Sequence, residues 1–243
     1  MSLNLRLISV IVTLLFLSSC EDSKSKSKPL EATSKKVDTL TTDTKTVEVE
    51  KVEPQPNYLA WEKVSQEELK PFLEEYAEEN PEMNIRIITS LGNIDVQLYP
   101  ETVWHRANFI RLAKLGYFNE TFFHRVVPNF VIQGGNSDKV ITAKMRSQLG
   151  KYLIPAEFYP AYRHHRGAFA AAKYTEQNMS KASSPYEFYI VQPKSGAHHL
   201  DDEHTVFGRV IRGMDVVDQI AQLPTDEGEW PMRNVFIDVE VLE

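Results

Sequence analysis

The chain has 243 residues, 42% of them hydrophobic, which is enough for a substantial core in one or two domains. Its formal net charge is −7 and no stretch is strongly basic, which argues against nucleic acid as a partner. Cys20 is the single cysteine, so the chain can form neither an internal disulfide nor a cysteine-ligated metal cluster.

The N-terminal residues have the features of a secretory signal. Arg6 precedes the apolar run LISVIVTLLFL (7–17). The run has eleven residues, whereas a helix needs about 20 to span a bilayer, so its length suits a secretory signal. The run ends in LSSC (17–20), which resembles the bacterial lipoprotein box, whose cysteine is lipid-modified and becomes the mature N-terminus. We expect residues 1–19 to be a lipoprotein signal peptide and Cys20 to anchor the protein to a bacterial membrane, on its periplasmic side or at the cell surface. An ordinary signal peptide with a chance cysteine is the alternative.

A polar segment follows the cysteine. Residues 21–57 contain no aromatic side chain and are dominated by Lys, Ser, Thr and Glu. Such a composition cannot bury enough apolar surface to offset the entropy of ordering the chain. We therefore expect residues 20–57 to be a disordered tether.

A helix is predicted where the composition changes, in SQEELKPFLEEYAEENPE (65–82). Ser65 followed three residues later by Glu68 matches a capping box. One helical face carries the apolar residues Leu69, Phe72, Leu73 and Tyr76. Pro81 would end the helix, and we expect residues 58–82 to be a helical extension outside the main core.

Residues 83–243 are expected to form the main domain, because they combine many short strand patterns with two helix patterns. The helices are predicted at 101–116 and 214–223. Strands are predicted as a hairpin within 84–100, as two short strands around Pro128-Asn129 within 122–135, and at 167–173, 186–191, 205–211 and 234–242. Since closure removes exposed sheet edges, the pattern favours a mainly-β, closed antiparallel barrel.

The segment FFHRVVPNFVIQGG (122–135) places Arg125 and Gln133 in an apolar stretch, although a buried charge is costly unless it is paired. The segment is similar to the cyclophilin signature, F-H-R-[VI]-[VI]-P-x-F-x-[IC]-Q-G-G. Further segments resemble other parts of that family in the same order: GNIDVQLYP (92–100), FIRLAKLGYFNETFFHRV (109–126), IPAEF (154–158), HRGAFAAAK (165–173) and HTVFGRVIRGMDVVDQI (204–220). The resemblance covers about residues 84–243. It implies an eight-stranded antiparallel barrel capped by two helices, peptidyl-prolyl cis/trans isomerase activity and no cofactor.

The resemblance also implies a substrate groove on the outside of the barrel. Its catalytic residues would be Arg125 and Gln133. Its substrate-binding residues would be Phe130, Val131, Ala172, Lys173, Glu187, Tyr189, Leu200 and His204. The partners would be proline-containing polypeptides in extended or partly folded form, and the protein, acting as a monomer, would assist folding in the bacterial cell envelope.

The implied reaction breaks no bond, so it needs neither a nucleophile nor a metal. Its barrier is amide resonance, about 18–20 kcal/mol. In the twisted state the proline nitrogen is pyramidal and its lone pair is free. A fixed cationic donor such as Arg125 would bond this state better than the planar ground state.

Three groove positions depart from the family pattern. Glu187 stands for the usual Gln, Lys173 for the usual Asn and Tyr189 for the usual Phe, while His199 occupies a position at which some members have Trp. If Glu187 pairs with Arg125, the pair could either orient the guanidinium or draw its charge away from the proline nitrogen. A carboxylate cannot donate to substrate backbone as the usual Gln does, so the hypothesis is the second: the pair weakens catalysis. Lys173 is the alternative partner for Glu187.

Two other interpretations remain open on the sequence. One is a cyclophilin-fold binding protein or chaperone with weak or no isomerase activity. The other is a metal-dependent hydrolase that uses His164, His165, His198, His199 and His204. Adjacent histidines usually point apart on a strand and the sequence has no HExxH pattern, which disfavours a metal site.

Overall fold

The computed structural model describes residues 57, 60–174 and 178–243. These residues belong to one compact unit, residues 52–243. The expected signal peptide, Cys20 and almost all of the expected tether lie outside the described residues. In the part of the chain that is described, no helix is long and apolar enough to cross a bilayer.

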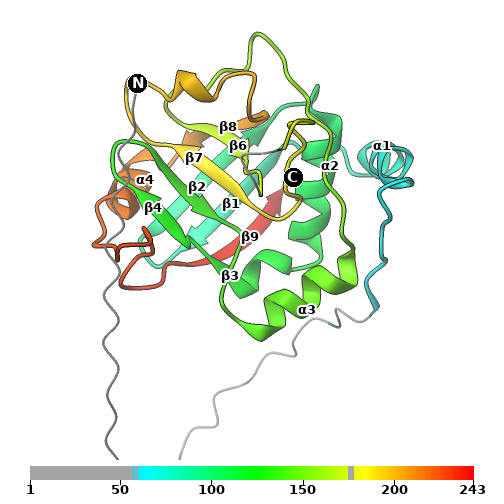
Figure 1. The fold of residues 1–243 in the computed structure, drawn as a ribbon, viewed down its shortest axis with the longest axis horizontal. Helices are drawn as coiled ribbons and strands as arrows, with labels where there is room; N and C mark the ends of the chain where they lie inside the picture. The colour runs from blue at the N-terminus through cyan, green and yellow to red at the C-terminus, as the bar shows by residue number, and fades with distance from the viewer. Residues whose placement is uncertain (1–56, 58–59, 175–177) are drawn as a thin grey trace, which may run out of the picture. The chain divides into compact units, whose positions relative to one another are not determined.

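Nine strands of the described chain form one antiparallel sheet that curls into a half-barrel around its core (Figure 1). In chain order they are β1 Asn84–Thr89, β2 Gly92–Leu98, β3 Thr121–Phe122, β4 Arg125–Val127, β5 Val131–Gly134, β6 Ala168–Ala171, β7 Phe188–Val191, β8 Val206–Arg212 and β9 Phe236–Leu242. The spatial order is β3-β9-β1-β2-β8-β6-β7-β5-β4. The mainly-β prediction is confirmed, and each predicted strand has a counterpart.

The structure corrects the predicted closed barrel of eight strands, because the sheet has nine strands and ends at β3 and β4. The segment before Pro128 is divided at Phe123 and His124. The Phe123 N–H donates to Val235 O, next to β9, whereas the His124 N–H donates to Gln133 O in β5. One extended segment therefore changes partner midway and forms the two ends of the sheet.

The strand register sorts side chains between two faces. Ile85 pairs with Val96 and Ile87 with Ile94 across the β1–β2 hairpin, and all four are fully buried in the main core. Alternation of this kind is what the sequence pattern predicts for a sheet with one buried face.

Four helices are present in the described residues: α1 Leu69–Glu79, α2 Val103–Lys114, α3 Val140–Leu149 and α4 Met214–Ala221. The two predicted helices of the main domain are confirmed as α2 and α4. They lie at opposite ends of the half-barrel (Figure 1) and bury residues such as Ile110 and Val217 in the same core. α3 was not predicted. Its buried residues are a narrow stripe of Thr142, Met145 and Leu149, which gives too weak a periodic signal.

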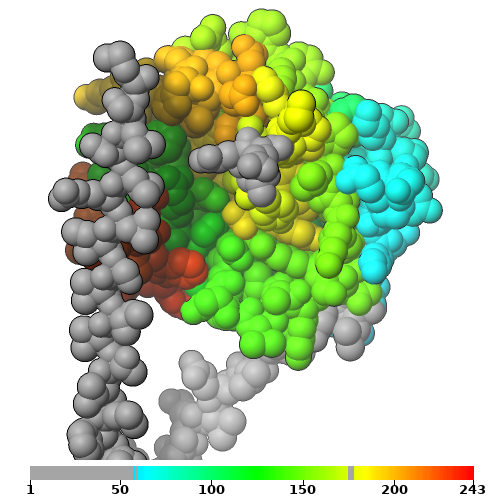
Figure 2. All heavy atoms as spheres, viewed as in Figure 1, coloured from blue at the N-terminus to red at the C-terminus, as the bar shows by residue number. Residues whose placement is uncertain are grey.

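The segment around α1 is attached to the rest of the unit by hydrogen bonds as well as by packing. α1 begins at Leu69, one turn later than predicted, and buries Leu69 and Leu73 in a small cluster against α2. Before the helix, the Val64 N–H donates to Leu149 O, and the Gln66 amide exchanges two hydrogen bonds with the Leu153 backbone. Figure 2 shows the cyan residues of this segment lying against the green residues that follow α3.

Candidate functional site

A cavity of about 230 Å³ lies where β4, β5, β6 and β7 meet the loop that precedes β8. It is lined by Arg125, Phe130, Val131, Gln133, Ala172, Lys173, Tyr189, Leu200 and His204. The structure therefore brings together nine of the ten groove residues expected from the sequence. Glu187 is the exception and does not line the cavity.

Strand register explains this convergence. Arg125 pairs with Gln133 across β4 and β5, and Gln133 pairs with Tyr189 across β5 and β7. Opposed residues on neighbouring strands project from the same face of a sheet. Their sequence neighbours Ile132 and Ile190 face the main core instead. The alternation that buries one face therefore lines up an arginine, an amide and an aromatic ring on the other.

The apolar part of the cavity consists of rings and a leucine. Phe130 stacks on His199, with ring centroids 5.4 Å apart, and the Arg125 guanidinium carbon lies 6.0 Å from the centre of the Phe130 ring. Leu200 ends a short 3₁₀ turn, His198–Leu200. These groups provide a half-enclosed apolar surface with one cation at its edge, as small-ligand sites commonly do.

His204 is neutral at neutral pH, because burial lowers its pKa to about 4. Its Nδ1 lies 3.2 Å from Ala171 O, and since a carbonyl oxygen can only accept, Nδ1 carries the proton and donates. The Nε2 atom is then the free acceptor of the ring. The cavity thus receives an uncharged imidazole rather than a second cation.

The Tyr189 hydroxyl belongs to a buried chain of hydrogen bonds that the sequence did not reveal. It lies 2.8 Å from His164 Nε2, and His164 Nδ1 lies 2.9 Å from Asp201 Oδ1. Burial lowers the pKa of His164, although Asp201 opposes the shift. Burial raises the pKa of Asp201, but hydrogen bonds from His164 and other donors hold it below its usual value. His164 Nδ1–H therefore donates to the Asp201 carboxylate, and the Tyr189 hydroxyl donates to His164 Nε2.

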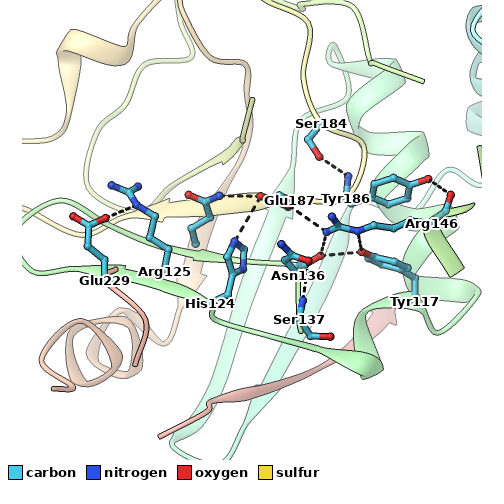
Figure 3. Close-up of polar contacts among 12 residues, drawn as sticks. Tyr117, His124, Arg125, Asn136, Ser137, Arg146, Ser184, Tyr186, Glu187 and Glu229 are labelled. Atoms are coloured by element: carbon cyan, nitrogen blue, oxygen red, sulfur yellow. Dashed lines mark hydrogen bonds and ion pairs between the residues drawn. The ribbon is translucent and has the colours of Figure 1, made fainter. Parts of the chain in front are cut away.

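Glu187 lies behind the cavity, in a network drawn in Figure 3. Its carboxylate accepts from Gln133 Nε2 at 3.0 Å and from the Arg146 guanidinium at 3.2 Å, and it lies 3.6 Å from His124 Nε2. Burial raises the pKa of Glu187, but the contacts with His124, Arg146 and Gln133 outweigh it and hold the pKa below its usual value. Because a carboxylate only accepts, the Gln133 amide nitrogen faces Glu187 and its carbonyl oxygen is directed elsewhere.

The end of β5 reaches this network through a glycine. Gly135 has φ +91°, and a Cβ at this position would lie 2.1 Å from Tyr186 O. Only glycine allows this close approach. The side chain of Arg146, from α3, reaches the same glycine and donates to Gly135 O and to the Tyr117 hydroxyl.

The hypothesis that Glu187 pairs with Arg125 was wrong. The Arg125 Nε–H donates to Glu229 Oε2 at 2.6 Å, and both side chains are partly exposed. The proposed alternative, Lys173 with Glu187, does not occur either, because Lys173 pairs with Glu203 at 3.3 Å. Neither Glu229 nor Arg146 was expected at the site from the sequence.

The histidines considered for a metal site are held in other contacts. His164 and His198 both contact the Asp201 carboxylate, and the His165 ring packs edge-on against His198. Among residues 57, 60–174 and 178–243, no three His, Cys, Asp or Glu side chains come together as metal ligands. This arrangement does not fit the hydrolase interpretation.

The family relationship follows from comparison with known proteins. The sequence model for "Cyclophilin type peptidyl-prolyl cis-trans isomerase/CLD" matches residues 84–241. This chain belongs to the cyclophilin family. One relative, the peptidyl-prolyl cis-trans isomerase of Acinetobacter baylyi, is 36% identical over 143 residues, which cover 58% of this chain and 73% of that protein.

Two further comparisons define the extent of the likeness. Peptidyl-prolyl cis-trans isomerase-like 2 of Rhizopus delemar is 39% identical over 157 residues, which are 63% of this chain. This cyclophilin spans about a quarter of the length of that relative, 27%. The crystal structure of a cyclophilin-type isomerase from Cryptosporidium parvum has a TM-score of 0.56 at 23% identity, covering 67% of this chain and 98% of that chain. At this identity, the likeness to the solved structure concerns the cyclophilin fold alone.

Proposed function

We propose that this cyclophilin is a peptidyl-prolyl cis/trans isomerase that acts on proline-containing polypeptides. The observation that carries the proposal is the meeting of Arg125, Gln133 and the Phe130 ring at one cavity of about 230 Å³. The Cryptosporidium parvum cyclophilin has also been solved in the presence of the dipeptide Ala-Pro, which supports the same substrate class here.

The cavity suits a reaction that only rotates an amide bond. Uncatalysed exchange about an X–Pro bond takes tens to hundreds of seconds. A typical enzyme rate of about 10–10³ s⁻¹ requires the barrier to fall by roughly 4–7 kcal/mol. Phe130 and Leu200 would hold the proline ring, while the Arg125 guanidinium at the rim would donate to the proline nitrogen as it becomes pyramidal.

The polar side of the cavity differs from what the family pattern provides. The Lys173 ammonium is bound to Glu203, and Glu187 is turned away from the cavity. Gln133 therefore remains the amide that can meet substrate backbone, through its carbonyl oxygen. These departures favour a second candidate function, a binding protein or chaperone with weak isomerase activity.

An isomerisation assay on a prolyl peptide with the full chain tests the proposal. Arg125→Ala should lower kcat/KM at least about thirtyfold, because removing one preorganised donor costs at least about 2 kcal/mol. Arg209→Ala is the matched control, since Arg209 is exposed on β8 and does not line the cavity. Equal activity of wild type and Arg125→Ala would remove Arg125 from the mechanism. A wild type that binds the peptide without accelerating exchange would favour the binding protein.

We further propose that the protein works in the bacterial cell envelope, where it assists protein folding while held by a lipid on Cys20. The support is the LSSC sequence after a short apolar run. In a bacterial host, Cys20→Ser should take up no labelled fatty acid and should leave the membrane fraction. Unchanged partitioning would contradict the anchor.

A further inference from the structure

The groove arginine is held by a residue far away in the sequence. The Arg125 Nε–H donates to Glu229 Oε2 at 2.6 Å, from the loop between α4 and β9 (Figure 3). Within the described residues, this is the hydrogen bond that the Arg125 side chain makes. Gln133, the neighbour best placed to brace it, has its amide nitrogen committed to Glu187. Glu229 is therefore the group that determines where the guanidinium lies.

The loop that carries Glu229 is itself ordered by several hydrogen bonds. Asp226 Oδ1 accepts from the N–H groups of Gly228 and Trp230, at 2.8 and 2.9 Å. The Asp226 N–H donates to Trp230 O, and the Glu229 N–H donates to Asp226 O. These bonds close a tight turn over residues 226–229, in which Glu229 is the closing residue.

Glu229 adopts a backbone conformation that a non-glycine residue rarely has. Its φ is +64°, in the left-handed region. Such positions persist when the surrounding structure enforces them, and they cluster at functional sites. Glycine would adopt this conformation without strain, as it does in many turns. A glutamate at this position therefore indicates that its side chain has a role.

The same residue is joined to the strand that carries the arginine. The Val126 N–H donates to Glu229 O at 2.8 Å, one residue after Arg125. Next to it, the Trp230 ring packs edge-on against Phe122, with centroids 5.3 Å apart. Backbone and side chain of Glu229 therefore engage β4 at two neighbouring points, which fixes the carboxylate relative to the base of Arg125.

We propose that Glu229 is a positioning residue for Arg125, an inference that rests on the proposed isomerase function. The Glu229 carboxylate accepts a hydrogen bond from the Arg125 Nε–H. The two terminal amino groups of the guanidinium then stay available to donate to a substrate in the cavity. The long Arg125 side chain loses rotamer entropy when it is fixed. Because Glu229 already fixes it in the free protein, this loss is not incurred during the reaction. The gain appears in the twisted state, where the guanidinium acts, so it affects kcat more than KM.

Kinetics of Glu229 variants of the full chain test this. Glu229→Ala should lower kcat about tenfold, with KM changed less than twofold. Glu229→Gln keeps an acceptor but loses the charge, so it should lower kcat only about threefold. Glu240→Ala, on an exposed position of β9, is the matched control and should keep wild-type kinetics. A kcat equal to or above that of wild type in Glu229→Ala would overturn the proposal.

Two measurements separate positioning from a general structural role. In the Arg125→Ala background, Glu229→Ala should change the residual rate less than twofold, because the group it positions is gone. A persisting tenfold loss there would show that Glu229 acts elsewhere and would overturn the proposal. By NMR, the Arg125 Nε–H should exchange slowly with water in wild type and in Glu240→Ala but rapidly in Glu229→Ala, and equal exchange in all three would also overturn it.

The outcomes for the two proposals are distinct. An inactive wild type would contradict the isomerase function, whatever the exchange of the Arg125 Nε–H. An active wild type with unchanged kcat in Glu229→Ala would contradict only the positioning role.

Discussion

Two glutamates lie on either side of the Arg125–Gln133 pair, and they differ in nearly every respect except residue type. Glu187 is about 10% exposed and contacts Gln133, Arg146 and His124. Glu229 is 43% exposed, and its carboxylate pairs with Arg125. Figure 3 shows them at different points of one row of polar groups.

The difference shows that burial decides whether a glutamate carboxylate contributes mainly to stability or mainly to the orientation of a neighbour. A buried charge must be satisfied, so Glu187 is bound to several donors and its loss would leave Arg146 without its carboxylate. A half-exposed pair such as Arg125–Glu229 contributes little to stability, typically about 0.2–1 kcal/mol, because water screens it. The first carboxylate therefore holds the fold behind the cavity, and the second orients a group in front of it.

The largest expected effect on folding is that of Glu187→Ala. It should lower the free energy of unfolding by about 3 kcal/mol, since removing one partner of a buried pair leaves an uncompensated charge. Glu229→Ala should lower it by less than about 1 kcal/mol. Urea denaturation of both variants measures the contrast. Similar losses in the two variants would mean that burial does not distinguish these carboxylates.

Acid pH should reduce the same contrast. The pKa of Glu187 lies below its ordinary value of 4.5 in the folded protein, because hydrogen bonds and positive neighbours outweigh burial. Its contribution to stability is therefore fully present above the unfolded value and is lost as pH falls through the lower, folded value.

The measurement is the difference in unfolding free energy between wild type and Glu187→Gln across pH 2–7. It should be constant above about pH 5.5 and shrink below pH 4.5. The same comparison with Glu240→Gln, at an exposed position, serves as the control. A Glu187 difference that grows as pH falls would contradict the lowered pKa.

The smallest effect on the isomerisation rate is expected for Tyr189→Phe, which removes a hydroxyl behind the cavity but keeps the ring. His164 Nε2 would lose its donor in a buried site, so stability should fall by about 1–2 kcal/mol. The isomerisation rate should change less than twofold, since the apolar surface is kept. A large loss of kcat with unchanged stability would instead place the hydroxyl in the reaction.

Much of this site was accessible from the sequence because it lies on regular strands. The resemblance to the family's motifs placed Arg125, Gln133 and Tyr189 at one groove. The structure supplies the physical reason, because they occupy paired strand positions whose sequence neighbours are buried. The direction of Glu187 was not predictable, because it precedes β7 and its orientation depends on Arg146, 41 residues away. Glu229 lies 104 residues from Arg125, and no local pattern marks a contact of that range.

The fold shows the same limit. Strands with strict alternation and the helices with broad apolar faces were predicted, while α3, with its narrow stripe, was not. The division of one extended segment into β3 and β4 depends on which neighbours its backbone meets, β9 or β5, and that is a tertiary property. The closed barrel was expected from the many short strands, and the number of eight strands from the family resemblance. Neither indicates which neighbours this segment pairs with.

The hydrogen bonds before α1 have a mechanical consequence. The described chain enters the domain near Trp61, and Val64 and Gln66 are bonded to the backbone of Leu149 and Leu153. Tension applied at the N-terminal side is therefore borne first by these few bonds and by the α1–α2 packing, before it reaches β1. We expect residues 61–79 to detach under load before the sheet that carries Arg125 loses its register.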